Sequence, residues 1–336
     1  MNGGQTVQTL KHVLSIAAIG TLLLANLLIL PIQAGTLETS PQRGSLTYKG
    51  RTRGRHSTTF FSWKDTAVSS YPLSTEEFST MSTSSNDDSN NMEVGIEWIN
   101  LYPPDDDTWG DLEYCDDDAE GFYDLLGANG WTQSDVNYGN DDAWEKDFEK
   151  ASVGGWDSTY IDNVDFAYFA GHGDIGFLKF STDHDGDGSH ETEVHYSETK
   201  WGDGDLEWIA LSSCRTLHPS VKEEWIAHAC AGGHLHAIVG FKTNMPDTAD
   251  LGETFAWHLL DGKGIKDAWK TATKEEFGSA VEAAIIYAVV YSTVGSPINY
   301  AQETLPNEGN YLSDPSYYAQ YYMFSSPVYY YDSWSC

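Results

Sequence analysis

Two short apolar runs, each followed by a reactive side chain, constrain the fold of this chain more than any other feature. The first reads V-D-F-A-Y-F-A-G-H-G-D and carries His172 between two glycines; the second reads L-E-W-I-A-L-S-S-C-R-T-L and carries Cys214 after two serines. Such runs, rich in aromatic and β-branched residues and bounded by glycine or polar residues, are typical of buried parallel strands. Ligands of an open α/β sheet bind at the carboxyl ends of its strands. We therefore expect His172 and Cys214 to lie at that edge, on neighbouring strands.

The two blocks resemble the caspase–haemoglobinase class (clan CD) of cysteine peptidases. The shared signature of that class is a hydrophobic block ending in His-Gly and a second block ending in a small residue and Cys. The wording F-A-G-H-G (Phe169 to Gly173) and L-S-S-C-R-T (Leu211 to Thr216) is most similar to CHAT and gingipain-type members. The resemblance covers the middle of the chain. It implies a three-layer caspase-like α/β fold, in which helices flank a mainly parallel central sheet, and the activity of a cysteine endopeptidase.

The resemblance also assigns roles to individual residues. Cys214 would attack a peptide carbonyl as the thiolate, and His172 would act as the general acid and base. A free thiol is mostly protonated near neutral pH, so this chemistry needs an adjacent imidazolium or positive dipole. The backbone N–H groups of Gly173 and Cys214 are the expected oxyanion donors. Asp165 and Asp174 are the candidates to orient the imidazole.

The charge balance restricts the partners of the chain. It has 51 acidic and 18 basic residues, for a net charge of -33. This excludes nucleic acid, because phosphates are neutralised by Lys and Arg. It favours adaptation to a saline habitat ahead of a specific cationic partner. An acidic cleft also favours a peptide or protein substrate with a basic residue before the scissile bond. We expect no organic cofactor, and the oligomeric state stays open.

The amino-terminal segment predicts export. Residues 13–30 form an apolar run, and Pro31 to Gly35 offer a small residue suited to signal peptidase. We read residues 1–34 as a signal peptide, ahead of a retained membrane anchor, so the protein is secreted or held at the cell surface. Six basic residues follow the run, however, and for a retained anchor this would favour a cytoplasmic domain. Residues 35–92, rich in Ser and Thr, are a linker or a basic pro-segment.

The remaining chain divides into an α/β domain over residues 93–300 and a tyrosine-rich extension over residues 301–336. The extension is expected to pack on the domain as an aromatic edge, with stacking against sugars or peptides as the other interpretation. Besides the two blocks, the patterns predict strands over 94–102, 131–138 and 234–241, and helices over 116–128, 143–150, 221–230, 251–260 and 265–277. Strands that alternate with helices indicate a mainly parallel sheet.

A calcium loop is the candidate cofactor site. Asp183, Asp185, Asp187 and Glu191 occupy positions 1, 3, 5 and 9 of an EF-hand-type loop, and Gly188 occupies position 6. Position 12, usually a bidentate Glu, is Val194. The segment is therefore either a Ca²⁺ site between the His and Cys blocks or an acidic surface turn.

Three alternatives stay open. His234 and His236, with His172, His184 and His190, could form the zinc site of a hydrolase, although the chain lacks H-E-x-x-H. A caspase-like domain could also be catalytically inactive and serve as a cell-surface binding module. Finally, Cys214 could form a disulfide with Cys230 instead of acting as the nucleophile.

Overall fold

The computed structural model describes residues 92–103, 109–184, 192–292, 295–316, 318 and 325–336. The predicted signal peptide or anchor and nearly all of the predicted linker lie outside these residues. Within the described part of the chain, no helix has the length and apolar character needed to cross a membrane.

The chain folds around a mixed, mainly parallel sheet of eight strands. Strands β2, β1, β3, β7 and β8 lie side by side and parallel, and β9 continues the sheet antiparallel to β8. Strands β10 and β11 both pair antiparallel with β9. The expected α/β class with a mainly parallel sheet is confirmed. The strand bounds are β1 Glu93–Trp98, β2 Thr132–Gly139, β3 Phe166–Ala170, β7 Trp208–Ser212, β8 Ala237–Phe241, β9 Glu282–Val290, β10 Ile298–Asn299 and β11 Val328–Ser335.

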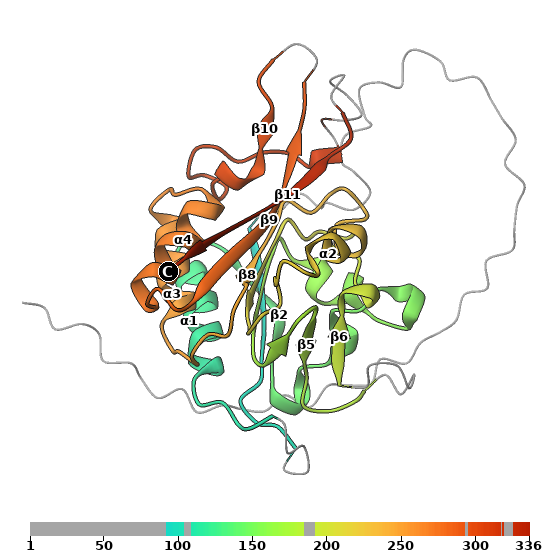
Figure 1. Ribbon diagram of the computed structural model, residues 1–336, viewed down its shortest axis with the longest axis vertical. Coiled ribbons are helices and arrows are strands. Elements are labelled where there is room, and N and C mark those ends of the chain that lie inside the picture. Colours follow the sequence, from blue (N-terminus) through green and yellow to red (C-terminus); the bar gives the residue numbers. More distant parts are fainter. Residues whose placement is uncertain (1–91, 104–108, 185–191, 293–294, 317, 319–324) are drawn as a thin grey trace, which may run out of the picture. The chain divides into compact units, whose positions relative to one another are not determined.

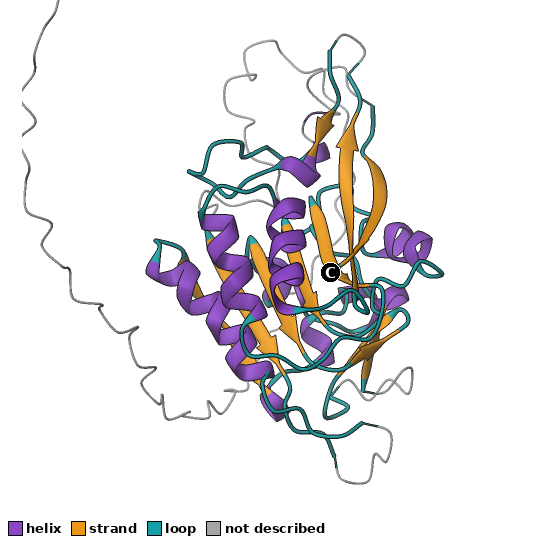
Figure 2. Ribbon diagram, turned by 60° about the vertical axis from the view of Figure 1, so that its left-hand side comes forward, coloured by secondary structure: helices purple, strands orange, loops and turns teal. Residues whose placement is uncertain are grey.

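Helices cover one face of this sheet, and a mixed layer covers the other (Figures 1 and 2). The first face packs against α1 (Cys115–Ala128), α3 (Leu251–Leu260) and α4 (Ile265–Glu276). The second packs against α2 (Lys222–His228) and a small antiparallel sheet. That sheet contains β4 (Gly173–Asp174), β5 (Phe177–Lys179) and β6 (Glu193–His195). Short 3₁₀ turns complete the fold: η1 Asn140–Asp142, η2 Glu145–Asp147, η3 Ala151–Val153, η4 Asp157–Thr159, η5 Ile161–Asn163, η6 Tyr196–Glu198 and η7 Tyr300–Gln302.

The two apolar runs are strands because both faces of the sheet are covered. In β3, Phe166 and Tyr168 pack toward the helices, while Ala167 and Phe169 pack toward the mixed layer. A strand buried on both sides needs apolar residues at every position, which explains the continuous runs. The runs are β3 and β7, and they are parallel neighbours.

One predicted helix is wrong. The segment 143–150 contains the 3₁₀ turn η2 within irregular chain, and no α-helix. Glu145, Asp147 and Glu149 are buried beside Ala143 and Phe148. An α-helix at the surface needs one apolar and one polar face, and this segment buries residues of both kinds. The predicted strand over 234–241 also begins later, at Ala237.

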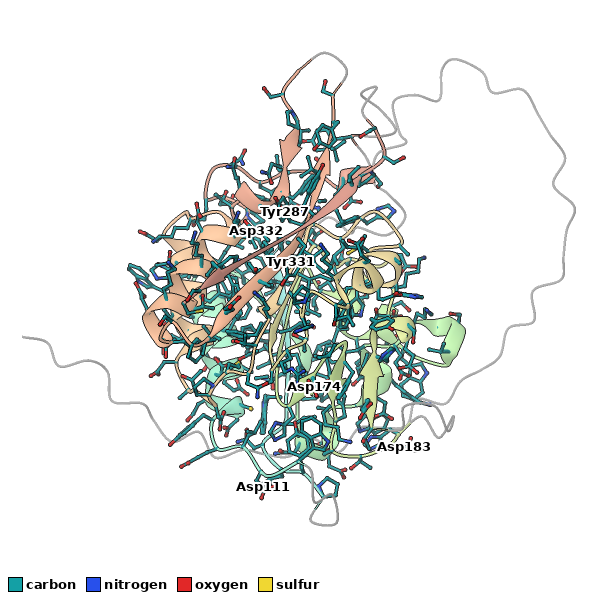
Figure 3. The ribbon with its side chains drawn as sticks, viewed as in Figure 1. Asp111, Asp174, Asp183, Tyr287, Tyr331 and Asp332 are labelled. Carbon is teal, nitrogen blue, oxygen red and sulfur yellow. The ribbon has the colours of Figure 1, made fainter. Side chains whose placement is uncertain are left out.

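The tyrosine-rich tail contributes a strand to the main sheet. Strand β11 pairs with β9 from Val328 opposite Val289 to Ser335 opposite Glu282. Figure 3 shows Tyr331, Asp332 and Tyr287 close together on these strands. The Tyr331 hydroxyl donates a hydrogen bond to the Leu217 carbonyl at 3.0 Å.

Candidate functional site

The register of β3 and β7 brings the two reactive residues together. The last paired residues are Ala170 and Ser212. Beyond them, the Gly171 N–H donates to the Ser212 carbonyl at 3.3 Å, and the Ser213 hydroxyl donates to the Gly171 carbonyl at 2.9 Å. Continuing this register places His172 opposite Cys214, at the carboxyl ends of two neighbouring parallel strands.

His172 and Cys214 line one small pocket of about 60 Å³. The pocket lies on the helical side, where Cys115 and Asp118 come from α1 and Asp247 comes from the loop after β8. Its lining is completed by Leu112, Gly171, Ser212, Met245 and Thr248. The thiol and the imidazole therefore share a pocket that also contains two carboxyl groups.

The His172 ring is held by the loop after β1. Its Nε2 lies 2.8 Å from the Gly110 carbonyl oxygen, an acceptor, so Nε2 carries a proton. The centroids of the Tyr102 and Trp109 rings lie 4.7 and 5.1 Å from that of the imidazole. The backbone N–H of His172 donates to the Tyr102 hydroxyl at 2.8 Å. In the neutral ring this tautomer makes Nδ1 the basic nitrogen.

The Cys214 thiol contacts the loop after β8. Its Sγ accepts from the Met245 N–H at 3.3 Å and donates to the Met245 carbonyl at 3.5 Å. Burial and the nearby Asp174 carboxylate raise the pKa of Cys214, and the Met245 contact and Arg215 only partly offset them. In this conformation the sulfur is therefore held as the thiol.

A strained turn sets the direction of Cys214. The next residue, Arg215, has a φ of 57°, in the left-handed region that non-glycine residues rarely adopt. Its guanidinium pairs with the Asp174 carboxylate at 3.0 Å, and its N–H donates to the Thr243 carbonyl. Asp174, a predicted orienting residue, is therefore bound to the turn that follows Cys214.

Gly173 lies where the two blocks touch. A Cβ atom at this position would lie 2.9 Å from Cγ2 of Thr216 and 3.0 Å from Cβ of Ser213. Only glycine allows this approach without a shift of the neighbouring chain. Gly173, a predicted oxyanion donor, is thereby packed directly against the turn that carries Cys214.

Asp118 is a buried acid at the wall of the pocket. Its oxygens accept hydrogen bonds from the Ser212 hydroxyl at 2.6 Å, the Gly252 N–H at 2.6 Å and the Tyr168 hydroxyl at 3.1 Å. Burial raises the pKa of Asp118 to about 7, despite these donors. The group joins α1, α3 and the two strands that carry the site.

The structure does not bring Asp165 to the imidazole. Asp165 precedes β3, whereas His172 follows it, and five strand residues separate the two ends by about 3.3 Å each. Its Oδ2 accepts from the Glu93 N–H at 2.7 Å, at the amino edge of the sheet. Among the predicted calcium ligands, Asp183 is exposed, and Asp185, Asp187 and Glu191 lie outside the described residues.

The four cysteines are free thiols, so the alternative disulfide between Cys214 and Cys230 is wrong. Of the histidines of the zinc alternative, His190 lies outside the described residues, and the described ones do not converge. His172 lies at the carboxyl edge, while His184 stacks on Trp144 and pairs with Glu145. Within the described ranges, groups of three or more close ligand side chains consist of carboxylates alone.

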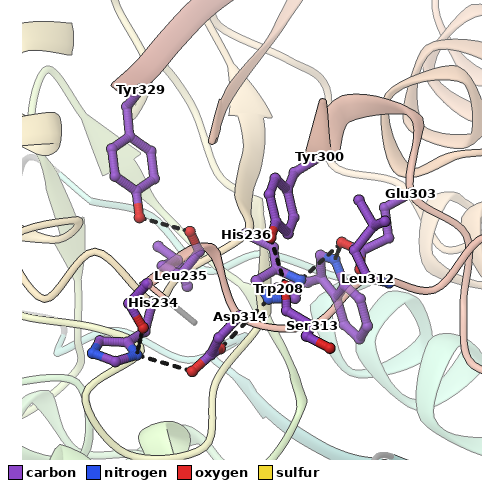
Figure 4. Close-up of polar contacts among 11 residues, drawn as sticks. Trp208, His234, Leu235, His236, Tyr300, Glu303, Leu312, Ser313, Asp314 and Tyr329 are labelled. Atoms are coloured by element: carbon purple, nitrogen blue, oxygen red, sulfur yellow. Dashed lines mark hydrogen bonds and ion pairs between the residues drawn. The ribbon is translucent and has the colours of Figure 1, made fainter. Parts of the chain in front are cut away.

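His234 and His236 instead take part in a polar cluster with the tail (Figure 4). His236 Nδ1 lies 2.8 Å from Glu303, its Nε2 lies 3.6 Å from Asp314, and His234 Nδ1 lies 2.9 Å from Asp314. Burial lowers the pKa of His236, but the Glu303 and Asp314 carboxylates outweigh it and raise the value to about 9. A protonated His236 holds the tail against the start of β8 and cannot ligate zinc in that state.

Sequence reasoning missed the residues that surround the reactive pair. Tyr102, Trp109 and Gly110 come from the chain after β1, and Met245 and Asp247 come from the loop after β8. Strands β1 and β8 flank β3 and β7 in the sheet, so their carboxyl-end loops border the same pocket. The prediction of a parallel sheet could have identified these loops, although not the individual contacts.

Together, the sheet and the pocket define an α/β protein with a thiol–imidazole pocket at the carboxyl edge of its parallel strands. Residues 96–326, more than half of the chain, match the family described as "Domain of unknown function (DUF6345)". The chain belongs to this family. None of the curated proteins matches it.

Proposed function

We propose that this protein is a cysteine endopeptidase with a three-layer caspase-like (clan CD) fold, in which Cys214 is the nucleophile and His172 is the base. The observation that carries the proposal is the register of β3 and β7, which sets the two side chains opposite each other in one pocket. The two sequence blocks and the layers on both faces of the sheet support it further.

The chemistry follows from the tautomer of His172. When a peptide carbonyl reaches the pocket, Cys214 Sγ forms a bond to the carbonyl carbon and its proton passes to Nδ1 of His172. The N–H groups of Gly173 and Cys214 stabilise the oxyanion. The C–N bond then breaks, and the imidazolium returns the proton to the leaving amine. Water hydrolyses the resulting thioester and regenerates the thiol.

The pocket volume determines how a substrate would bind. Pockets that enclose a ligand measure about 300–1,000 Å³, whereas this one measures about 60 Å³. A peptide would therefore lie across its mouth, and the Met245 loop would shift to release Cys214. Catalytic hydrogen bonds often tighten only in the substrate complex.

A basic residue before the scissile bond is the proposed preference. The carboxyl groups of Asp118 and Asp247 both line the pocket beside Cys214. With the Met245 loop shifted, a Lys or Arg side chain at the mouth of the pocket would approach these groups and favour their ionised form. Asp247 also accepts the N–H groups of Glu113 and Tyr114, directly before α1.

Calcium dependence and export belong to the same proposal. In the sequence, the predicted calcium loop of Asp183, Asp185, Asp187 and Glu191 follows β5 and precedes β6, and both strands belong to the small sheet that includes Gly173. Ca²⁺ bound by these residues would connect β5 and β6 beside the catalytic residues. The apolar run at residues 13–30 supports secretion or a cell-surface location.

A second candidate function is a non-catalytic binding module. The observation that favours it is the raised pKa of Cys214, which leaves little thiolate at neutral pH. In that case the pocket would recognise a peptide without cleaving it.

The test compares two thiols of the same pocket. The full chain is incubated with Ca²⁺, peptides that carry Arg, Lys or Ala before the cleaved bond, and an alkylating label. We expect cleavage after Arg or Lys, labelling of Cys214, and loss of both in Cys214→Ala. Cys115→Ala is the matched control and should remain active. His172→Ala keeps the Cys214 thiol but should lose the cleavage activity.

Other results would favour other functions. Peptide binding without turnover, equal in the wild type and Cys214→Ala, supports the binding module. Activity that is lost with a strong zinc chelator but kept in Cys214→Ala supports a metallohydrolase.

A further inference from the structure

The amino edge of the sheet, opposite the reactive pair, carries a row of acidic side chains. In the register, Val94 of β1 lies beside Phe166 of β3, and Phe166 lies beside Trp208 of β7. The residues that precede these three are Glu93, Asp165 and Glu207. Glu93 is the first residue of β1, whereas Asp165 and Glu207 directly precede the neighbouring strands β3 and β7. Asp205 lies two residues before Glu207 in the sequence.

Three of these carboxylates converge on one point. Oxygen atoms of Glu93, Asp165 and Asp205 all lie within 4.8 Å of one another. Carboxylate oxygens that bind one Ca²⁺ ion lie about 2.3–2.6 Å from it, so two such ligands are at most about 5 Å apart. The spacing is therefore that of ligands around a single ion.

Asp165 supplies an independent sign of a missing partner. The residue is fully buried, and its Oδ1 has no hydrogen-bond partner among the described residues. Its Oδ2 accepts the Glu93 N–H at 2.7 Å, and its carboxyl group also pairs with that of Glu207. Burial raises the pKa of Asp165, and the charges of Asp205 and Glu93 contribute in the same direction, while the hydrogen bonds with the Glu93 N–H and Glu207 partly oppose it. A buried carboxylate among other carboxylates requires a proton or a cation.

We propose that Glu93, Asp165 and Asp205 form a Ca²⁺ site that joins the starts of β1, β3 and β7. All three side chains offer only hard oxygen ligands, which favour Ca²⁺ over Zn²⁺ or Cu²⁺. Glu207, beside Asp165 in the register, is placed to complete the coordination or to hold a ligand in position. The site lies on the opposite edge from Cys214 and shares no residue with the calcium loop predicted from Asp183 to Glu191.

A Ca²⁺ ion here would act on the first strand of the domain. Glu93 is the first residue of β1, directly after the linker predicted for residues 35–92. An ion shared by Glu93, Asp165 and Asp205 would fix this strand to its neighbour β3 and to β7 beyond. The site is therefore structural, and its loss would loosen the amino end of the sheet before it affected the Cys–His pocket.

A second acidic group nearby differs in its partners and serves as a control. Asp157, Asp162 and Asp203 also lie within 4.8 Å of one another. Asp162 already accepts the N–H groups of Gly202 and Gly204 at 2.7 and 2.8 Å, and Asp203 forms an ion pair with Lys200. Asp157 Oδ2 is also buried without a hydrogen-bond partner among the described residues, but Lys200 already brings a positive charge to Asp203 in this group.

The test measures Ca²⁺ binding to the full chain after treatment with chelator, by calorimetry and by thermal unfolding. Asp187→Asn serves as the background, because it disables the separate loop. In that background we expect one Ca²⁺ ion to bind and to raise Tm by several degrees. Glu93→Gln should weaken binding about tenfold, because affinity follows the number of charged ligands. Asp165→Asn should abolish binding, and Asp203→Asn should leave it unchanged.

The stability of Asp165→Asn shows whether a loss of Ca²⁺ binding comes from the missing ligand or from unfolding of the variant. Asn keeps an oxygen acceptor for the Glu93 N–H but removes the buried charge. Without Ca²⁺ this variant should therefore unfold at the same temperature as its background or higher, and Ca²⁺ should not raise it. Folded Asp165→Asn and Glu93→Gln variants that bind Ca²⁺ with unchanged affinity would overturn the proposal, as would an Asp187→Asn background that binds none.

Discussion

The backbone of Arg215 concentrates the strain of the site in one residue. Its positive φ turns the chain directly after Cys214, and its guanidinium forms an ion pair with the Asp174 carboxylate. Left-handed backbone at a non-glycine residue costs about 1 kcal/mol or more, and such strain is common where a reactive side chain is positioned. The ion pair is more than one-third exposed on both sides, so it contributes little to stability.

This strain can be measured with a pair of variants. Arg215→Ala and Arg215→Gly both remove the ion pair, but only glycine adopts the positive φ without strain. We expect Arg215→Gly to be more stable than Arg215→Ala by about 1 kcal/mol in urea unfolding. Equal stabilities would show that the turn relaxes when the guanidinium is absent.

Single residues also show what the sequence could predict. The placement of His172 and Cys214 follows from two runs of similar length that form parallel neighbours, so the pattern alone was sufficient. Asp165 lies close to His172 in sequence, but β3 separates the two residues. An extended strand carries its two ends to opposite edges of the sheet, so closeness in sequence does not bring Asp165 to the imidazole.

At the scale of elements, Asp118 joins α1 to β3, β7 and α3. Its pKa is about 7 in the folded chain, raised from the ordinary value of 3.8 for an aspartic acid. Because the folded state binds the proton more tightly, this group's stabilising contribution is complete below pH 4 and is lost as the pH rises to 7. The change is on the order of 4 kcal/mol at most, at about 1.4 kcal/mol per unit.

Asp118→Asn tests this contribution. Asn can accept from the Gly252 N–H and donate to the Ser212 hydroxyl, but it does not titrate. We expect the wild type to lose more stability than Asp118→Asn between pH 4.5 and about pH 7.5, measured by urea unfolding at several pH values. The comparison removes the effects of other acidic groups, which the two proteins share. Parallel pH profiles would mean that Asp118 is ionised throughout.

The alternation of β11 gives a second prediction at this scale. Tyr331 packs toward the core and donates to the Leu217 carbonyl, whereas Tyr330 is 38% exposed. Tyr331→Ala should destabilise the protein by about 2–3 kcal/mol, since it removes a packed ring and leaves a carbonyl without its donor. Tyr330→Ala is the matched control and should cost less than half as much. Thermal and urea unfolding give both values, and similar losses would contradict the orientation of the strand.

Predictability differed among elements for a physical reason. Helix α3 was expected over 251–260 and found over Leu251–Leu260, because its apolar residues recur at helical spacing. The helix predicted over 143–150 was wrong because its acidic residues are buried by long-range contacts, which no local sequence pattern contains. The loop that carries Met245 and Asp247 reaches the pocket through the order of strands in the sheet, which is likewise a long-range property.

At the scale of the whole molecule, acidic charge is the dominant feature. The full chain has a net charge of -33, and carboxylates line both the pocket and the amino edge of the sheet. Charge of one sign destabilises a compact state through self-repulsion. Salt shortens the range of that repulsion from about 10 Å at 0.1 M to about 3 Å at 1 M. The folded state should therefore depend on ionic strength more than on any single ion pair.

We expect Tm to rise steeply with NaCl up to about 0.5 M and more slowly above it, since screening is nearly complete once the Debye length falls below the spacing of surface charges. Sucrose at equal osmolality is the control, because it stabilises by exclusion without screening. The measurement is made in chelator, so that Ca²⁺ does not contribute. A larger rise of Tm in sucrose than in NaCl would mean that bound cations already neutralise the acidic surface. Specific ion binding, and not screening, would then explain the stability.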